Sequence, residues 1–475
     1  MKSILPILTL AICMMMGIGS AQAQTFPTGS WGGKLDLGSM ELRLILNVSQ
    51  GEDGVLQGTL DSPDQGAKGL PVDKVSFENN VLTFTAMGGA ATYEGTYDAA
   101  QSQVSGTFSQ AGQQFPLVLT PAGETGPPKR PQTPQPPYAY GIEELEIPNE
   151  EAGITLTGTL TYPPNRAIKS AIVLVSGSGP QDRDETIMGH KPFAVLADAF
   201  TKAGYAVFRY DDRGVGASTG QFATATTEDF ASDALAVVKF LQKRADIDPD
   251  KIVVAGHSEG GAIATMLAAH HSEVAGAIFM AGPGVAMDEI LIQQERDLFV
   301  KSGFEPELMD RWKLVKEKLY KAVLNSNDEG ELEQIILAQA EDWLADITPE
   351  ERQMLDATPE KLTQSIRTLS SPWMRFFLSY DPAKDLQSIK CPVLAINGSK
   401  DIQVAPKQNL TAIQQNLEAG KCKDITVQEL EGLNHLFQTA DTGLPIEYNQ
   451  IEETFAPSAI EVMIEWLKPR FPDYQ

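Results

Sequence analysis

Apolar and polar side chains alternate in short runs between residues 30 and 120. Runs such as ELRLILNV and VLTFTA place apolar side chains on one face and polar side chains on the other, and glycine, asparagine and aspartate separate these runs. A period of two residues with such punctuation is typical of half-buried antiparallel strands. We therefore predict a small antiparallel β barrel or sandwich over residues 24–120.

The alternation ends at the stretch PAGETGPPKRPQTPQPP, which contains seven prolines between Pro121 and Pro137. Proline lacks the backbone N–H that a sheet needs, and proline-rich chains adopt the polyproline II conformation, at roughly 3.1 Å per residue. Residues 121–137 are therefore predicted to form a semi-rigid linker between two domains.

From residue 138 onward, apolar runs of strand length alternate with segments of helix length. AIVLVSG, AVFRYDD, KIVVAG and GAIFMAG are such runs, and CPVLAINGSKD resumes the series after a helical interruption of about a hundred residues. This alternation indicates right-handed crossovers and a mostly parallel sheet with helices on both faces. We predict an α/β catalytic domain over residues 138–475, with a helical cap inserted at residues 285–385.

The N-terminus carries a lysine followed by an apolar run that ends at Ala21-Gln22-Ala23. This order is typical of a secretory signal peptide, so we expect cleavage after Ala23 and secretion to the periplasm. The run is short for a membrane-spanning helix, and no other segment is long and apolar enough to span a membrane.

The charge and the sequence motifs of the chain argue against some classes of partner and cofactor. The formal net charge of −26 argues against nucleic acid, because phosphate binding needs clustered lysine and arginine. No cysteine and histidine spacing suggests zinc, and no G-x-G-x-x-G motif opens a dinucleotide fold, so we expect no cofactor and no metal.

Cys391 and Cys422 each precede an apolar strand-like run. The sequence is consistent with a disulfide between them and equally with two separate buried thiols.

The most informative stretch is KIVVAGHSEGGAIATMLAAH, in which Ser258 lies between Gly256 and Gly260. A serine hydroxyl at the tip of a strand needs a sharp turn, and glycines two residues before and after remove side chains where strand and helix crowd each other. G-x-S-x-G between a strand and a helix is a nucleophile elbow. We therefore predict that Ser258 is a catalytic nucleophile.

One of the five histidines is expected to take the proton of this serine. His435, in EGLNHLFQ, follows the last strand and comes late in the chain, in the order Ser–Asp–His. His190, in the loop after an earlier strand, is its rival. The side chain of His257 must point away from the serine beside it, and His270 and His271 end the following helix, too far back to reach.

The orienting carboxylate should follow a strand at the same edge of the sheet. Asp401 in LAINGSKDIQV fits this position, and Asp288, after GAIFMAG, is the fallback. Two backbone N–H groups should stabilise the oxyanion. We expect them on Glu259, at the start of the helix, and on Ser178, with Gly179 as the second choice for the latter.

Together, LVSGSGPQDRD, YDDRGVGAS, AGHSEGG, INGSKDIQV and GLNHLFQ resemble the α/β-hydrolase superfamily. More narrowly, they are similar to its bacterial esterase D-type, serine aminopeptidase-like members, over about residues 140–475. The resemblance implies cofactor-free hydrolysis of carboxylic esters through an acyl-enzyme on Ser258, with Asp401, His435 and a helical cap. Many members have His-Gly where this chain has Ser176-Gly177, a departure that the esterase D-like subgroup shares. The N-terminal region resembles β-rich modules of some secreted relatives.

We therefore expect a secreted serine esterase that acts on short-chain or glycan-linked acyl esters. A peptidase with the same triad and a non-catalytic glycan-binding protein are the alternatives. Arg183 is expected to fix the shape of its own loop, and contact with a polar group of the substrate is the alternative. The run SPWMRFFLSYDP should supply the core of the cap, with some of its large side chains facing the serine: Trp373, Met374, Phe376 and Phe377.

Overall fold

The structure is a computed structural model that describes residues 25–36, 41–51, 54–63, 67–110, 112–122, 129–164 and 170–472. The chain divides into two compact units, Met1–Thr125 and Gly126–Gln475. The predicted signal peptide lies outside the described residues and stays a prediction. Within the described part of the chain, no helix is long and apolar enough to cross a membrane.

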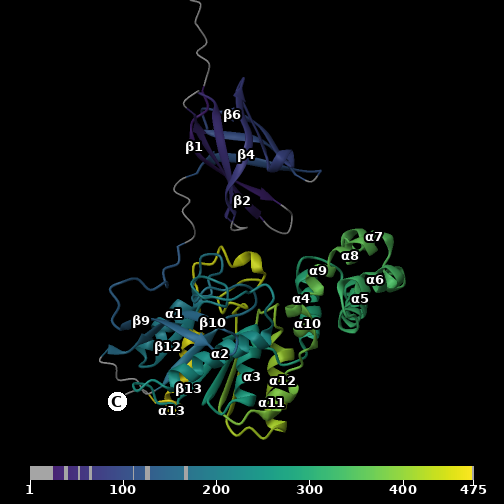
Figure 1. Ribbon diagram of the computed structural model, residues 1–475. Coiled ribbons are helices and arrows are strands. Elements are labelled where there is room, and N and C mark those ends of the chain that lie inside the picture. The colour runs from purple at the N-terminus through teal and green to yellow at the C-terminus, as the bar shows by residue number, and fades with distance from the viewer. Residues whose placement is uncertain are drawn as a thin grey trace, which may run out of the picture. The chain divides into compact units, whose positions relative to one another are not determined.

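In the first unit, eight antiparallel strands close into a barrel (Figure 1). The strands are β1 (Gly29–Asp36), β2 (Glu41–Gln50), β3 (Leu56–Ser62), β4 (Ala67–Glu78), β5 (Val81–Ala86), β6 (Ala91–Asp98), β7 (Gln103–Gln110) and β8 (Gln113–Pro121), with a 3-10 turn at Met87–Gly89. Each strand pairs with the next, and Trp31 of β1 pairs with Pro121 of β8 to close the ring. The predicted antiparallel β fold is confirmed, and of the two forms considered it is the barrel.

Apolar side chains fill the interior of this barrel. Along β5, buried and partly exposed positions alternate strictly, as a period of two residues requires. Leu46, Leu82, Phe84 and Tyr93 are at most 2% exposed. The Tyr93 hydroxyl donates to the carbonyl of Val104 at 3.1 Å, so even this buried polar group is satisfied.

The second unit contains an eight-stranded sheet in the order β16-β15-β14-β13-β11-β12-β10-β9. The strands are β9 (Gly141–Asn149), β10 (Ile154–Tyr162), β11 (Ala171–Val175), β12 (Ala206–Tyr210), β13 (Ile252–His257), β14 (Gly276–Met280), β15 (Val393–Gly398) and β16 (Ile425–Leu430). β10 pairs antiparallel with both β9 and β12, and the other pairs in this sheet are parallel. The predicted, mostly parallel sheet is confirmed, and the carboxyl ends of β11, β13, β15 and β16 therefore share one edge.

Helices cover both faces of this sheet. On one face lie α1 (Pro192–Lys202) and α13 (Pro457–Arg470), and on the other α2 (Thr227–Gln242), α3 (Glu259–His270), α11 (Ala383–Ser388) and α12 (Pro406–Ala419). The central strands β11, β13, β14 and β15 are buried along their whole length. Such continuous apolar strands are the pattern of a parallel sheet covered on both faces.

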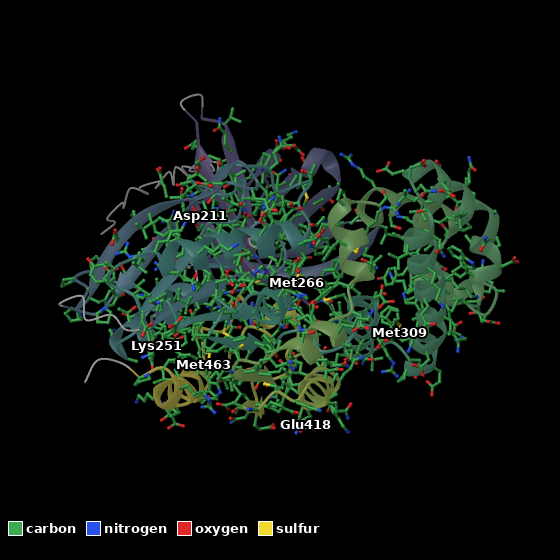
Figure 2. All side chains as sticks on the ribbon, turned by 60° about the horizontal axis from the view of Figure 1, so that its bottom comes forward. Asp211, Lys251, Met266, Met309, Glu418 and Met463 are labelled. Atoms are coloured by element: carbon green, nitrogen blue, oxygen red, sulfur yellow. The ribbon has the colours of Figure 1, made fainter. Side chains whose placement is uncertain are left out.

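A block of helices lies between β14 and β15. It comprises α4 (Met287–Lys301), α5 (Pro306–Asn325), α6 (Glu329–Trp343), α7 (Pro349–Met354), α8 (Pro359–Gln364), α9 (Ile366–Leu369) and α10 (Pro372–Ser379). Met309 lies in the apolar core of this cap, whereas Met266 and Met463 belong to the cores on the two faces of the sheet (Figure 2). The predicted insertion, residues 285–385, extends too far at its end. It includes the start of α11, which packs on the sheet against α3 and α12 and does not belong to the cap.

Part of the predicted linker, residues 121–137, belongs to the second unit. Its Arg130 guanidinium donates to the carbonyl of Ile451 at 2.7 Å, and the amide of Gln132 donates to the carbonyl of Phe455 at 2.7 Å. Proline content predicts an extended chain but says nothing of side chains that bind elsewhere. The segment around these two residues is therefore docked on the α/β unit.

Candidate active site

Ser258 lies between β13 and α3 with backbone angles of φ 54° and ψ −118°, a conformation that residues other than glycine rarely adopt. A Cβ atom at Gly256 would lie 1.9 Å from the carbonyl oxygen of Gly260, and one at Gly260 would lie 2.2 Å from that of Val175. Only glycine fits at either position. The G-x-S-x-G spacing is thus a steric requirement of this turn.

Asp401 and His435 meet at the same edge of the sheet, in the loops that follow β15 and β16. Nδ1 of His435 lies 2.8 Å from Oδ2 of Asp401. Oδ1 of Asp401 accepts the backbone N–H groups of Gln403 at 2.7 Å and Val404 at 3.0 Å. The carboxylate is buried and satisfied on both oxygens, so it can fix the orientation and tautomer of the imidazole.

Ser258 and His435 both line a cavity of about 430 Å³. Within the described part of the chain, no hydrogen bond joins the Ser258 hydroxyl to His435. Such contacts are often long without substrate and tighten when it binds. The geometry therefore brings the acid and the histidine into contact and places the serine on the same cavity.

The walls of this cavity differ in polarity. The cap and the segment leading into it supply apolar side chains: Pro283, Met287, Ile290, Leu291, Trp373 and Phe377. Three neutral amides also line it: Gln181, Gln294 and Gln403. Of the aromatic run in α10, Trp373 and Phe377 face the cavity, while Met374 packs against the core of the cap and Phe376 stacks on Tyr380. An apolar wall with a few polar groups is typical of small-molecule sites.

The loop of residues 176–181, here called the oxyanion loop, follows β11. The N–H of Gly177 is already used, because it donates to Oε1 of Glu185 at 2.7 Å. Among the described residues, no acceptor engages the N–H groups of Ser178 and Glu259, and both residues line the cavity. Gly179 does not line it. The geometry thus leaves the N–H groups of Ser178 and Glu259 free to act as the two predicted oxyanion donors.

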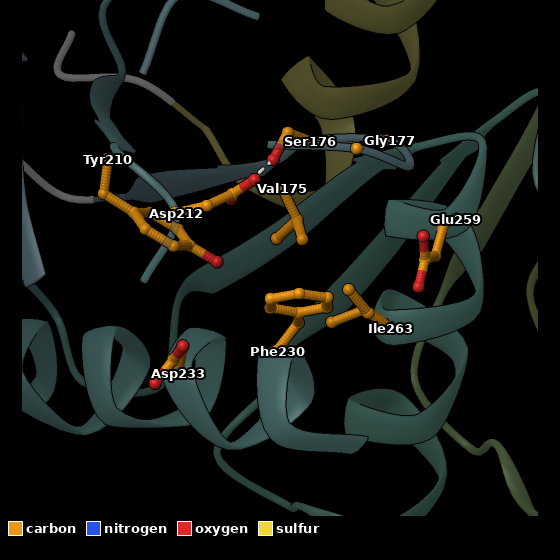
Figure 3. A pocket seen from close by; sticks show the side chains of 10 residues that line it. Val175, Ser176, Gly177, Tyr210, Asp212, Phe230, Asp233, Glu259 and Ile263 are labelled. Atoms are coloured by element: carbon orange, nitrogen blue, oxygen red, sulfur yellow. Dashed lines mark hydrogen bonds between the residues drawn. The ribbon is translucent and has the colours of Figure 1, made fainter. Parts of the chain in front are cut away.

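Asp212 anchors the oxyanion loop from behind. Its carboxylate accepts the hydroxyl of Ser176 and the N–H of Gln181, both at 2.9 Å. Figure 3 shows the Ser176 contact beside a cavity of about 10 Å³, the size of one water molecule, which Glu259 also lines. Burial raises the pKa of Asp212 to about 7 against the effect of its two hydrogen bonds, and the nearby carboxylates of Glu185 and Glu259 raise it to a smaller extent. Ser176 and Gln181 thus tie the oxyanion loop to Asp212.

Glu259 links the elbow to the cap. Its Oε1 accepts the hydroxyl of Thr227 at 2.6 Å and the indole N–H of Trp373 at 2.8 Å. Trp373 lies in α10, and its ring packs against that of Phe377, with centroids 4.9 Å apart. The sequence carried no signal for this contact, because its partners are more than a hundred residues apart.

His257 and Glu185 form a second acid–histidine pair beside the site. Nδ1 of His257 lies 2.9 Å from Oε1 of Glu185, and its Nε2 lies 2.9 Å from the carbonyl oxygen of His435. Burial alone would lower the pKa of His257, but Glu185, the His435 carbonyl and Asp401 together raise it above its ordinary value. The side chain of His257 thus engages neighbouring loops, and sequence reasoning missed Glu185.

The rival residues lie elsewhere. His190 is buried against the carbonyl of Tyr448 at 2.7 Å and the hydroxyl of Thr454 at 2.9 Å, and it does not line the cavity. Asp288 lies in the first turn of α4 and caps the N–H of Glu289. His190 is therefore not placed to take the proton of Ser258, and it is Asp401, not Asp288, that contacts His435.

Arg183 is part of a salt-linked network. Its guanidinium pairs with Asp211 at 2.8 Å and also contacts Glu144, and it does not line the cavity. These carboxylates raise the pKa of Arg183 further above its ordinary value, against the effect of burial. The geometry supports the interpretation that Arg183 fixes its own loop.

Cys391 and Cys422 are free thiols in this structure. The Cys422 thiol donates to the carbonyl of Cys391 at 3.4 Å, so the two residues are neighbours at the amino end of β15 and β16. Burial, and to a lesser extent Cys422, raises the pKa of the Cys391 thiol to about 12. A disulfide is not formed.

Comparison with known proteins identifies the family. The family described as serine aminopeptidase, S33, matches residues 190–440, more than half of the chain, and this range includes Ser258, Asp401 and His435. Esterase EstD from Thermotoga maritima is 27% identical over 319 residues, which is 64% of this chain and 66%, just under two thirds, of that esterase.

Solved structures with a similar chain trace include two hydrolases. An esterase from Pyrococcus furiosus is 16% identical with a TM-score of 0.42, covering 70% of this chain and 91% of its own. The α/β hydrolase GrgF from Penicillium sp. sh18 is 16% identical with a TM-score of 0.44, covering 70% of this chain and 99% of its own. On the evidence of the matched range 190–440, the chain belongs to the serine aminopeptidase S33 family of α/β-hydrolases.

Proposed function

We propose that this hydrolase cleaves uncharged carboxylic esters through an acyl-enzyme on Ser258. The observation that carries this proposal is the absence of an available charge around the serine. Among the described residues that line the cavity, none is lysine or arginine. Its two carboxylates, Glu185 and Glu259, are at most 3% exposed and already accept two hydrogen bonds each.

This lining favours esters over short peptides. A peptide with a free amino terminus carries an ammonium group, and burying that charge without a partner is costly. A peptide carboxylate would likewise lack a cationic partner in this cavity. A neutral ester brings no such charge, and its acyl or alkyl part fits the apolar wall that the cap provides.

In the proposed mechanism, His435 accepts the proton of the Ser258 hydroxyl while Oγ attacks the carbonyl carbon of the ester. Asp401 holds Nδ1 of the imidazole protonated and stabilises the imidazolium that forms. The backbone N–H groups of Glu259 and Ser178 donate to the oxyanion, each contributing roughly 2.7–4 kcal/mol. The alcohol leaves with the proton from His435. Water, deprotonated by the same histidine, then releases the acid from the serine.

The amide side chains suggest the class of substrate. Gln181, Gln294 and Gln403 can each donate to and accept from hydroxyl or ether oxygens, which a sugar presents in quantity. Short-chain acyl esters, free or linked to a glycan, satisfy both the apolar and the amide side of the cavity. The predicted secretion of the chain suits such a substrate.

The decisive experiment compares the wild type with Ser258→Ala on p-nitrophenyl esters of short acids and on aminoacyl p-nitroanilides. We expect ester hydrolysis to fall by roughly three orders of magnitude or more. Ser272→Ala, at an exposed serine in the turn after α3, is the matched control and should leave the rate unchanged. Faster turnover of the anilides would favour a peptidase. A wild type no faster than Ser258→Ala on either substrate would overturn the proposal.

A further inference from the structure

The Glu185–His257 pair connects three loops of the site. Oε1 of Glu185 accepts the N–H of Gly177 in the oxyanion loop at 2.7 Å and faces Nδ1 of His257 in the elbow at 2.9 Å. Nε2 of His257 faces the carbonyl oxygen of His435 at 2.9 Å. These loops follow β11, β13 and β16, and one unbroken chain of hydrogen bonds runs through all three.

The contacts of His257 and Glu185 favour a charged pair. Nε2 of His257 faces a backbone carbonyl oxygen, which can only accept, so Nε2 carries a proton, and Nδ1 shares a second proton with Oε1 of Glu185. Burial lowers the pKa of His257, but Glu185 and the His435 carbonyl raise it above its ordinary value, which favours this proton on the imidazole. The residues Glu185 and His257 are 1% and 5% exposed. The pair is therefore a buried imidazolium–carboxylate ion pair, and its ring lies beside that of His435 with centroids 4.8 Å apart.

The buried ion pair and the backbone conformation of Glu185 are both energetically unfavourable features. Buried ion pairs contribute little net stability, because desolvation offsets their attraction. Glu185 also has a φ of 52°, which strains the backbone of a residue other than glycine. Strain and buried charge together at one residue next to an active site point to a role in geometry rather than in stability.

We propose that Glu185 and His257 are positioning residues that hold the oxyanion loop, the elbow and the loop of His435 in register for catalysis. This inference rests on the proposed ester hydrolysis at Ser258. The Gly177 bond fixes the peptide just before the Ser178 N–H, and the His435 bond fixes the backbone of the base. Small displacements of either group from the reacting atoms reduce the rate strongly while leaving substrate binding largely intact.

The test uses Glu185→Gln, His257→Gln and the double variant in the full chain. Rates are referred to active sites counted by complete labelling with a fluorophosphonate. Glu185→Gln leaves a single acceptor oxygen and removes the negative charge that balances the imidazolium of His257. We expect kcat to fall at least tenfold in each single variant, with KM within threefold of the wild type. Because the pair acts as one unit, the double variant should lie within threefold of the slower single variant.

Asp424→Asn is the matched control. It removes another ion-paired carboxylate, bound to Arg470 at 2.6 and 2.8 Å, from the opposite end of β16, and it should leave kcat unchanged. Single variants with kcat within twofold of the wild type, or losses that multiply in the double variant, would overturn the inference. If Glu185→Gln does not fold, kcat of His257→Gln alone decides it. A wild type no faster than Ser258→Ala would instead remove the proposed function, and this inference with it.

Discussion

Replacing His190 by glutamine should change how the stability of the α/β unit depends on pH. His190 is 1% exposed, and in its neutral form it satisfies both ring nitrogens with the carbonyl of Tyr448 and the hydroxyl of Thr454. Burial, and secondarily the Arg130 guanidinium, lowers its pKa from 6.5 to about 4, against the effect of the Tyr448 carbonyl. Glutamine at this position keeps a hydrogen-bond donor but cannot ionise.

The difference in pKa between the folded and the unfolded chain sets the direction in which stability changes with pH. The pKa of His190 is lower in the folded than in the unfolded chain, so its contribution is fully present above pH 6.5 and is lost as the pH falls toward 4. A pKa shift of this size corresponds to about 3 kcal/mol in the free energy of unfolding, of which about 2.5 kcal/mol is lost by pH 4.5. Relative to His190→Gln, the wild type should therefore lose about 2.5 kcal/mol between pH 7.5 and pH 4.5.

Urea unfolding of the two proteins at both pH values measures this difference, with the transition of the α/β unit followed by its tryptophans. The carboxylates that also titrate in this range contribute equally to both proteins and cancel. His270→Gln serves as the control, because the His270 side chain is 59% exposed and should produce no comparable change. A gap between wild type and His190→Gln that stays constant within about 0.5 kcal/mol would refute the reasoning.

Two further pairs of substitutions test contacts of the elbow. Gly260→Ala would place a Cβ 2.2 Å from the carbonyl oxygen of Val175, so we expect a loss of about 3 kcal/mol in the free energy of unfolding. Gly432→Ala, with a φ of 79° and open space around it, should lose only about 1 kcal/mol, and equal losses would contradict the steric argument. Trp373→Phe and Glu259→Ala each remove one partner of the indole–carboxylate contact, so their losses should be non-additive by about 1.5–3 kcal/mol. Additive losses in a double-mutant cycle would show that this contact does not couple the two residues.

The features that the sequence predicted are those with a local physical cause. Alternation with a period of two produced the barrel strands, and buried apolar runs produced the parallel sheet. The glycines around Ser258 are required by atoms within the turn itself or in the adjacent strand. Asp401 is predictable because it follows a strand at the edge where parallel strands end, which is a rule of topology rather than of contacts.

The features that could not be predicted depend on contacts between distant segments. Glu185 lies in the run DRDET, which reads as a solvated charged loop, and its partner His257 is 72 residues away. Arg130 lies in a proline-rich stretch and binds a carbonyl at Ile451, 321 residues away. No periodicity or spacing encodes such pairs, because each depends on where the completed fold places two loops.

The cap leaves the sheet after β14 and returns at β15, and these two strands pair directly from Ala277–Val393 to Met280–Ile396. Their pairing therefore does not depend on how many residues lie between them. Over evolutionary time the cap can lengthen, shorten or be exchanged while the elbow and the loop of Asp401 keep their places. In this architecture, selection for a new substrate acts on one part of the chain and selection for bond cleavage acts on another. Trp373 is the exception, since a replacement cap would still have to present a donor to Glu259.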